Sequence, residues 1–393
     1  MLGTIARMIT KRARLWLSRG IAAAVMVVFV VLVGSTWLYS GEIESQLLRL
    51  APAGAGPRDL TVVAADAGTV TLPLDERTGL PGTWGLAYEG GYAEVGDVVS
   101  TGGGVVTREI NHMTGSLGPG TAASLDRMAF DGDPSSRRVP FEEVLVSGPL
   151  GDYPAWLGHG SDDTWVLFVH DLGADRREAL RLLPAIAALD LPWMAVTYRN
   201  DAGAPVGGGR AGLGHDESAD LEAAIEFAVS EGASDVVLVG YGVGASIIEV
   251  FMHDSRQAGR VAGIVLDGPL LDAAERIDRL AAADRVPRFI VGWAKAVATL
   301  RFGIDWGDLD HVAHAVEIAV PTLIIHGEND RLNPVAVSSE FVASAPRLNR
   351  LVVVPGAGHG ESWNVDPVSY EQAVAGFLGE IAVGPPAESG GEG

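Results

Sequence analysis

Three short loops of unusual composition hold the residue types that could do chemistry in this chain. They cover residues 240–245 (GYGVGA), 326–330 (HGEND) and 356–359 (GAGH). Each loop directly follows an apolar run that is typical of a buried strand. Because active groups collect at the carboxyl ends of strands in an open parallel sheet, the three loops are predicted to meet at one edge of a sheet.

The first loop has the setting of a nucleophile elbow but lacks the nucleophile. The pattern G-x-S-x-G, between a strand and a helix, exposes a reactive serine on a sharp turn. Gly240 and Gly244 match the flanking glycines, which the turn needs because backbones approach closely there, whereas Gly242 stands at the serine position. Asp330 and His359 follow in the order acid, then histidine, of a catalytic triad. The spacing predicts an acid and a base facing a position without a hydroxyl.

The elements that must position these residues begin near residue 141. From there apolar strands alternate with amphipathic helices, which indicates βαβ units and a mostly parallel sheet flanked by helices. We expect this domain to cover residues 141–383, with a small helical lid at about 268–318. Strands are expected at 141–148, 152–160, 164–170, 193–198, 235–240, 261–267, 321–327 and 350–356, and helices near 180–189, 215–230, 243–253 and 368–381.

The first forty residues predict a transmembrane helix. Residues 21–39 are uncharged, and as a helix they span roughly 28 Å, about one hydrocarbon core. Five basic residues lie in the segment 1–20 (Arg7, Lys11, Arg12, Arg14, Arg19). This bias predicts a cytoplasmic N-terminus, an extracytoplasmic remainder and attachment to the cell membrane. A cleaved signal peptide is the alternative, but the run is long for one and no clear A-x-A site follows it.

Between the anchor and the βαβ region, the pattern favours a linker and a small β-rich extension. Residues 40–59 are read as the linker, and residues 60–140 as the extension. Short apolar stretches from 60 to 110 predict antiparallel strands, whereas 111–139 are expected to form a loop with at most a short helix. The tail, residues 384–393, is expected to be disordered.

These motifs together resemble the α/β-hydrolase superfamily, near the serine esterase, lysophospholipase and S33 aminopeptidase group. The resemblance covers residues 141–381. More narrowly, the stretches TWVLFVHDLGADR, YRNDAGAP, VVLVGYGVGASI, IVLDGPLLD, RFGIDW and ESWNVDP resemble membrane-anchored bacterial α/β-hydrolases of largely undefined substrate. The resemblance implies an α/β-hydrolase fold and hydrolysis of ester or amide bonds.

The resemblance also implies roles for individual residues. Asp330 would orient the imidazole and His359 would be the general base. The backbone N–H groups of Val243 and Leu172 would form the oxyanion hole. The sequence departs from the family pattern at Gly242 and at Asp171, where a glycine is usual. A carboxylate pointing into an oxyanion site would oppose the negative charge that develops there.

Other residues have competing interpretations. Gly240, Gly242 and Ala245 also fit the dinucleotide pattern G-x-G-x-x-A, with Asp267 as a ribose-binding acid, although such a pattern usually opens its domain. For other candidates a structural role is the commoner one. His170 is expected to pack and hydrogen-bond under the loop, Asn200 and Asp201 to form a turn, and Ser246 to lie one turn deeper in its helix. The aromatic residues of 289–306 are expected either to line an apolar pocket or to pack within the lid.

No cofactor and no metal is expected from the sequence. His311 and His314 are three residues apart but lack a matched third ligand. The chain has no cysteine, which excludes disulfides and thiolate chemistry, and its net charge of −22 opposes binding to nucleic acid. An acyl or amide ligand stays open as a partner, and the oligomeric state is not predicted.

Three functions remain open at this point. The first is a pseudoenzyme that binds a ligand without chemistry. The second is weak hydrolysis by a water that His359 activates. The third is an ordinary hydrolase in which Gly242 is not the natural residue. Because loss of the nucleophile removes the acyl-enzyme, the sequence predicts that Gly242→Ser would restore activity.

Overall fold

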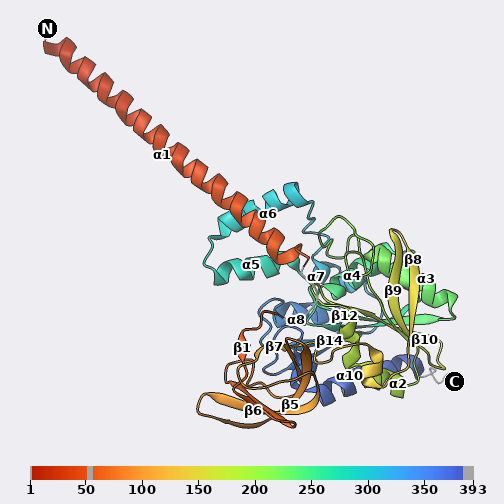
Figure 1. Cartoon of the computed structure of the whole chain (residues 1–393). Coiled ribbons are helices and arrows are strands. Elements are labelled where there is room, and N and C mark those ends of the chain that lie inside the picture. The colour runs from red at the N-terminus through yellow and green to blue at the C-terminus, as the bar shows by residue number, and fades with distance from the viewer. Residues whose placement is uncertain (1, 51–55, 384–393) are drawn as a thin grey trace, which may run out of the picture. The chain divides into compact units, whose positions relative to one another are not determined.

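The structure, a computed structural model, describes the backbone of residues 2–50 and 56–383, and side chains from residue 16 onward within these ranges. The predicted disordered tail, residues 384–393, lies outside the described residues, as does part of the predicted linker. The chain divides into two compact units. One comprises residues 1–49 and 274–306, and the other comprises residues 50–273 and 307–393. Each is described by itself (Figure 1).

The larger unit is built around an eight-stranded sheet with the order β15-β14-β13-β12-β10-β11-β9-β8. The first six of these strands pair in parallel, and β9 and β8 complete the sheet as an antiparallel pair. The mostly parallel sheet predicted from the sequence is therefore confirmed. Its strands are β8 (Glu142–Gly148), β9 (Gly151–Gly158), β10 (Thr164–Val169), β11 (Trp193–Ala195), β12 (Asp235–Tyr241), β13 (Val261–Asp267), β14 (Thr322–Gly327) and β15 (Asn349–Val354).

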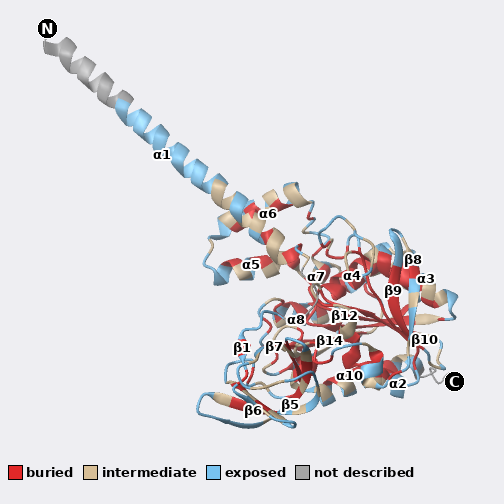
Figure 2. Cartoon of the chain, viewed as in Figure 1, coloured by how far each residue is buried: buried red, intermediate tan, exposed pale blue. Residues whose placement is uncertain are grey.

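Helices cover both faces of this sheet because its strands are apolar on both sides. Alternate strand residues belong to two separate cores: Leu167 and Leu238 pack with one set of helices, and Val166 and Val237 with another. The first set is α3 (Ser218–Ser230), α4 (Val243–Asp254) and α8 (Val335–Ser344), and the second is α2 (Leu183–Ala188) and α10 (Pro367–Val383). Figure 2 shows the resulting buried centre.

Short helices complete this unit. The helix expected at 180–189 is shorter than predicted, because a 3-10 helix, η2 (Arg176–Arg181), precedes α2 and Pro184 lies in the first turn of α2. The remaining short helices are η1 (Pro134–Arg137), η3 (Arg256–Arg260), α7 (His311–His314), η4 (Ala315–Glu317) and α9 (Ser362–Val365).

The β-rich extension is a separate seven-stranded antiparallel sheet with the order β1-β7-β4-β5-β6-β3-β2. Its strands are β1 (Leu60–Thr61), β2 (Ala64–Ala65), β3 (Thr69–Pro73), β4 (Trp84–Tyr88), β5 (Gly91–Gly102), β6 (Val105–Thr114) and β7 (Ala122–Asp126). The loop expected over 111–139 was partly wrong. β7 lies there as a central strand between β1 and β4, and its weak apolar pattern is stabilised by this pairing rather than by local propensity.

The smaller unit contains α1 (Leu2–Leu47), α5 (Ala273–Ala283) and α6 (Arg288–Phe302), with α5 starting one residue before the unit boundary. Helix α1 continues eight residues past Tyr39, through part of the predicted linker. Residues 16–47 of α1 are long and apolar enough to cross a membrane, and none of their most apolar window is buried in the protein. The α5 and α6 helices lie within the predicted lid.

Candidate functional site

The elbow has the predicted backbone geometry. Gly242 lies between β12 and α4 with φ 49° and ψ −109°, a conformation that side chains other than glycine adopt with strain. A Cβ at Gly244 would lie 2.2 Å from the carbonyl oxygen of Val169, and one at Gly240 would lie 2.9 Å from the Ala245 backbone. The two flanking glycines are therefore required by close backbone contacts.

Asp330 and His359 are brought together at the same edge of the sheet. His359 Nδ1 lies 2.8 Å from Asp330 Oδ2, and Asp330 Oδ1 accepts the backbone N–H groups of Leu332 and Asn333, each at 2.8 Å. His326, at the end of β14, also lies 3.3 Å from Asp330 Oδ2. The acid is thus held on both oxygens and fixes the orientation of the imidazole.

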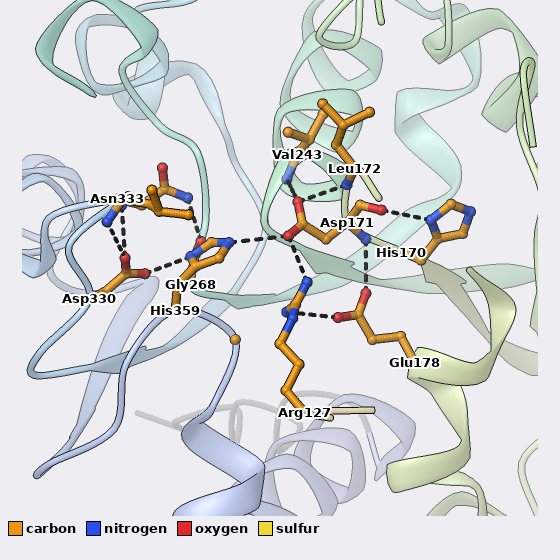
Figure 3. A network of polar contacts seen from close by, with 12 residues as sticks. Arg127, His170, Asp171, Leu172, Glu178, Val243, Gly268, Asp330, Asn333 and His359 are labelled. Carbon is orange, nitrogen blue, oxygen red and sulfur yellow. Dashed lines mark hydrogen bonds and ion pairs between the residues drawn. The ribbon is translucent and has the colours of Figure 1, made fainter. Parts of the chain in front are cut away.

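The Asp171 carboxylate lies over the elbow, between the two backbone donors named from the sequence. Asp171 Oδ1 accepts the N–H groups of Leu172 and Val243, both at 2.8 Å (Figure 3). Asp171 Oδ2 lies 3.1 Å from His359 Nε2. The acidic side chain therefore points inward. One of its oxygens occupies the point where two N–H groups converge, and the other contacts the imidazole.

Arg127 holds the same carboxylate from the side of the β-rich extension. Its guanidinium donates to Asp171 Oδ2 at 3.0 Å and to Glu178 Oε1 at 3.1 Å, while Glu178 Oε2 accepts the backbone N–H of Asp171 (Figure 3). Sequence reasoning missed Arg127 and Glu178. Neither lies in a motif, and Arg127 follows β7, the strand that was not predicted.

The protonation states follow from these contacts. Burial alone would lower the pKa of His359, but the hydrogen bonds and charges of Asp171 and Asp330 outweigh burial and raise it to about 9. Burial opposes the charged form of Asp171, yet the hydrogen bond and charge of His359 and the charge of Arg127 hold the Asp171 pKa well below its usual range. At neutral pH the site therefore contains an imidazolium between two carboxylates.

A side chain at position 242 would collide with this arrangement. A Cβ at Gly242 would lie 2.1 Å from Asp171 Oδ1 and 2.2 Å from Asp171 Cγ. Asp171 is 5% exposed and has partners on both oxygens, so moving it aside breaks several hydrogen bonds at once. The glycine at 242 and the aspartate at 171 fit each other.

The other residues considered from the sequence have structural contacts. His170 stacks on Tyr198 with ring centroids 4.3 Å apart, and its Nε2 lies 2.8 Å from Asp201 Oδ2. Asn200 has φ 74° and accepts the backbone N–H of Gly207, which is a turn role. Ser246 is fully buried, and its Oγ contacts the carbonyl of Leu213 and His311 Nε2.

The residues considered from the sequence for a cofactor or a metal site have other contacts in the structure. Asp267 is 1% exposed and accepts a hydrogen bond from Tyr370, so its carboxylate is not open to a ribose. His311 contacts Ser246 rather than pairing with His314. Instead, the ligand atoms of His253, His314 and Glu317 lie within 4.8 Å of one another, near the surface.

A pocket of about 220 Å³ lies beside the polar network. The extension contributes Trp84 and Leu125 to its wall, and the loop after β10 contributes Gly173 and Ala174. Arg127 and Glu361 complete the part of the wall next to the Asp171 network. The pocket thus lies where the extension meets the larger sheet.

Comparison with solved structures identifies the architecture. An esterase of Pyrococcus furiosus matches with a TM-score of 0.51 at 17% identity, over 63% of this chain and 94% of the esterase. A second crystal form of the same esterase matches with a TM-score of 0.50, over 64% of this chain and 96% of the esterase. The chain has the α/β-hydrolase fold.

Sequence comparisons add two further findings. An uncharacterised protein of Mycobacterium tuberculosis, found in two strains, is 29% identical over 230 residues, which are 57% of this chain and 73% of that protein. Residues 61–126 match a domain of unknown function, DUF8805. The matched range coincides with the seven-stranded sheet of the β-rich extension and ends immediately before Arg127.

Proposed function

We propose that this protein is a membrane-anchored relative of the serine esterases and lysophospholipases that has lost acyl-enzyme chemistry. The observation that carries the proposal is the position of Asp171. Its carboxylate takes the two N–H groups that would bind an oxyanion and contacts the imidazole that would activate a serine. The site is thereby filled by the protein's own side chain.

Two arguments support the loss of acyl-enzyme chemistry. Gly242 has no hydroxyl, and removal of a triad nucleophile costs on the order of 10⁶ in rate. Ser246 offers no replacement because it is fully buried and bonded to the Leu213 carbonyl. In addition, a charged carboxylate in the oxyanion hole repels the negative charge of a tetrahedral intermediate.

Hydrolysis by a water activated at His359 is the less favoured alternative. A general base must be unprotonated, whereas the two neighbouring carboxylates raise the pKa of His359 to about 9. The Nε2 atom, which would accept the proton of the water, faces Asp171 Oδ2 at 3.1 Å. This mechanism would need Asp171 to leave its position.

Ligand binding without turnover is the use that remains for the site. The pocket combines the apolar side chains of Trp84 and Leu125 with polar groups of both charges, and a small acyl or amide ligand needs both kinds of contact. The charged residues of its wall are Arg77, Asp126, Arg127 and Glu361. We expect members of a panel of acyl esters and aminoacyl amides to raise the unfolding temperature of the full chain in detergent. No stabilisation by any member, or equal stabilisation of Trp84→Ala, would remove the support for this pocket.

The test of the main proposal is labelling with a fluorophosphonate probe, together with hydrolysis of the same panel. The parent chain is expected to show neither. Gly242→Ser alone is expected to stay inert, which revises the expectation from the sequence, because its Cβ would overlap Asp171. Gly242→Ser combined with Asp171→Gly frees the hole and is expected to label, and His359→Ala in that background should abolish labelling. Strong labelling of the parent would contradict the proposal.

We further propose that α1 anchors the protein, with the N-terminus in the cytoplasm and the α/β-hydrolase fold outside. The apolar part of α1 supports this because it is exposed rather than packed into a core. Protease added to intact spheroplasts of a bacterial host is expected to digest the large unit and to spare an epitope tag at the N-terminus. Protection of the large unit would overturn this orientation.

A further inference from the structure

Helices α5 and α6 belong to the same compact unit as α1, and specific contacts join α6 to the end of the apolar stretch of α1. Arg301 donates to the carbonyl of Trp37 at 3.2 Å and to Ser40 Oγ at 2.6 Å. The Arg301 guanidinium also lies 4.0 Å from the centroid of the Trp37 ring. Residues 37 and 40 flank the end of the uncharged stretch 21–39. The carboxyl end of α6 is therefore held at the level where that stretch ends.

Helix α6 has two apolar faces, of which only one is covered. Val291, Ala294 and Ala298 are buried. Phe289, Trp293 and Leu300 are 57%, 67% and 87% exposed. Their spacings of four and seven residues place these three side chains on one side of the helix. Large apolar side chains grouped in this way mark a surface that meets another apolar phase.

The charges of α6 differ from those of the rest of the chain. The helix contains Arg288, Lys295 and Arg301 and no acidic residue, whereas the chain carries a net charge of −22. Basic residues beside an apolar face with a tryptophan are typical of helices that lie in a membrane interface. The long side chains of lysine and arginine can then reach the headgroup region.

We propose that α6 lies in the extracytoplasmic interface of the membrane, with Phe289, Trp293 and Leu300 inserted among the lipids. Of its basic residues, Arg288 is exposed and lies at the headgroups. Lys295 pairs with Asp278, and Arg301 contacts α1. This inference rests on the proposed membrane anchor, because α1 sets the level of α6 through Arg301. The occupant of the exposed face is thus the lipid bilayer. In this proposal, the helical segment that was expected to line a pocket or to pack as a lid makes a second membrane contact.

The experiment uses the absence of cysteine from the chain, which allows single labelling sites in the full-length protein. Trp293→Cys and Leu300→Cys, each carrying an environment-sensitive NBD label, are placed in lipid nanodiscs. Leu32→Cys reports on the anchor, and Glu226→Cys, exposed on α3, is the aqueous control. We expect blue-shifted emission at 293 and 300, quenched several-fold more by a nitroxide near the lipid headgroups than by one at mid-bilayer.

The controls separate failure of this inference from failure of the anchor. If the label at Leu32 is not quenched by either nitroxide lipid, the proposed anchor is wrong. If Leu32 is quenched while 293 and 300 behave like 226, the anchor holds and the interfacial helix is overturned. Blue-shifted emission at 293 and 300 without quenching by lipid would show that protein, such as a second copy of this chain, covers the face, which also overturns the proposal.

Discussion

The two sides of the candidate site differ in how far they match the geometry of a catalytic triad. On one side, Asp330 and His359 have the acid–imidazole contact at 2.8 Å that a triad needs. On the other side, the elbow has Gly242 at φ 49° and two converging N–H groups, but no hydroxyl, and the Asp171 carboxylate accepts both N–H groups. The difference teaches that the backbone geometry of a nucleophile elbow can be present without a hydroxyl, because the fold itself requires the turn.

The largest expected effect on stability concerns Arg127, on the elbow side. Arg127→Met leaves Asp171 and Glu178, whose side chains are 8% and 1% exposed, without their shared cation. Loss of one partner of a buried ionic network costs about 3 kcal/mol. Thermal unfolding of the full chain in detergent should show a clearly lower midpoint.

The matched control for Arg127 is an exposed ion pair. Arg350 and Glu380 are both more than half exposed, and such pairs contribute less than about 1 kcal/mol. Arg350→Met should therefore change the midpoint little. If Arg127→Met changes the unfolding midpoint as little as Arg350→Met does, the ionic network around Asp171 does not stabilise the elbow, and this part of the account is wrong.

A double-mutant cycle measures the fit between positions 242 and 171. Gly242→Ala is expected to destabilise the protein by about 2 kcal/mol, because the new Cβ overlaps Asp171 Oδ1 and the backbone conformation disfavours alanine. In an Asp171→Gly background only the backbone strain remains, so the cost should fall to about 1 kcal/mol. Additive effects of the two substitutions would mean that Asp171 does not lie over the elbow.

The smallest expected effect on stability concerns Asn333, on the side of the site that holds Asp330 and His359. Asn333 is 3% exposed and donates its Nδ2–H to the carbonyl of Gly268 at 2.8 Å. Asn333→Ala should lower the free energy of unfolding by about 1 kcal/mol. Ser339→Ala, at an exposed position on α8, serves as the control and should have almost no effect. Equal midpoints for the two variants would contradict a supporting role for Asn333.

The fold was predictable from the sequence because it depends on repeated local patterns. Apolar runs that alternate with segments of helical periodicity predicted the parallel sheet, and the glycines at 240 and 244 predicted the elbow. β7 was not predictable, since a five-residue strand between β1 and β4 depends on its partners.

The site was predictable only in part. Loops after β12, β14 and β15 place Gly242, Asp330 and His359 at one edge of the sheet, as predicted. For Asp171, the sequence analysis stated only what would follow if its carboxylate pointed inward. Their roles remain predictions. Arg127 could not be found, because its contact with Asp171 joins two domains and depends on the placement of the extension rather than on any local pattern.

The most direct test of the central claim, that the Asp171 carboxylate fills the oxyanion position and contacts the imidazole, is an NMR titration of His359. Because the pKa of His359 is raised above its ordinary value of 6.5, its protonation stabilises the fold fully at a pH below 6.5. This stabilisation is lost as the pH rises through about 9, the pKa in the folded protein. We predict titration near 9 in the parent chain and a markedly lower pKa in Asp171→Asn. Titration of the parent near 6.5, unchanged in Asp171→Asn, would contradict the account.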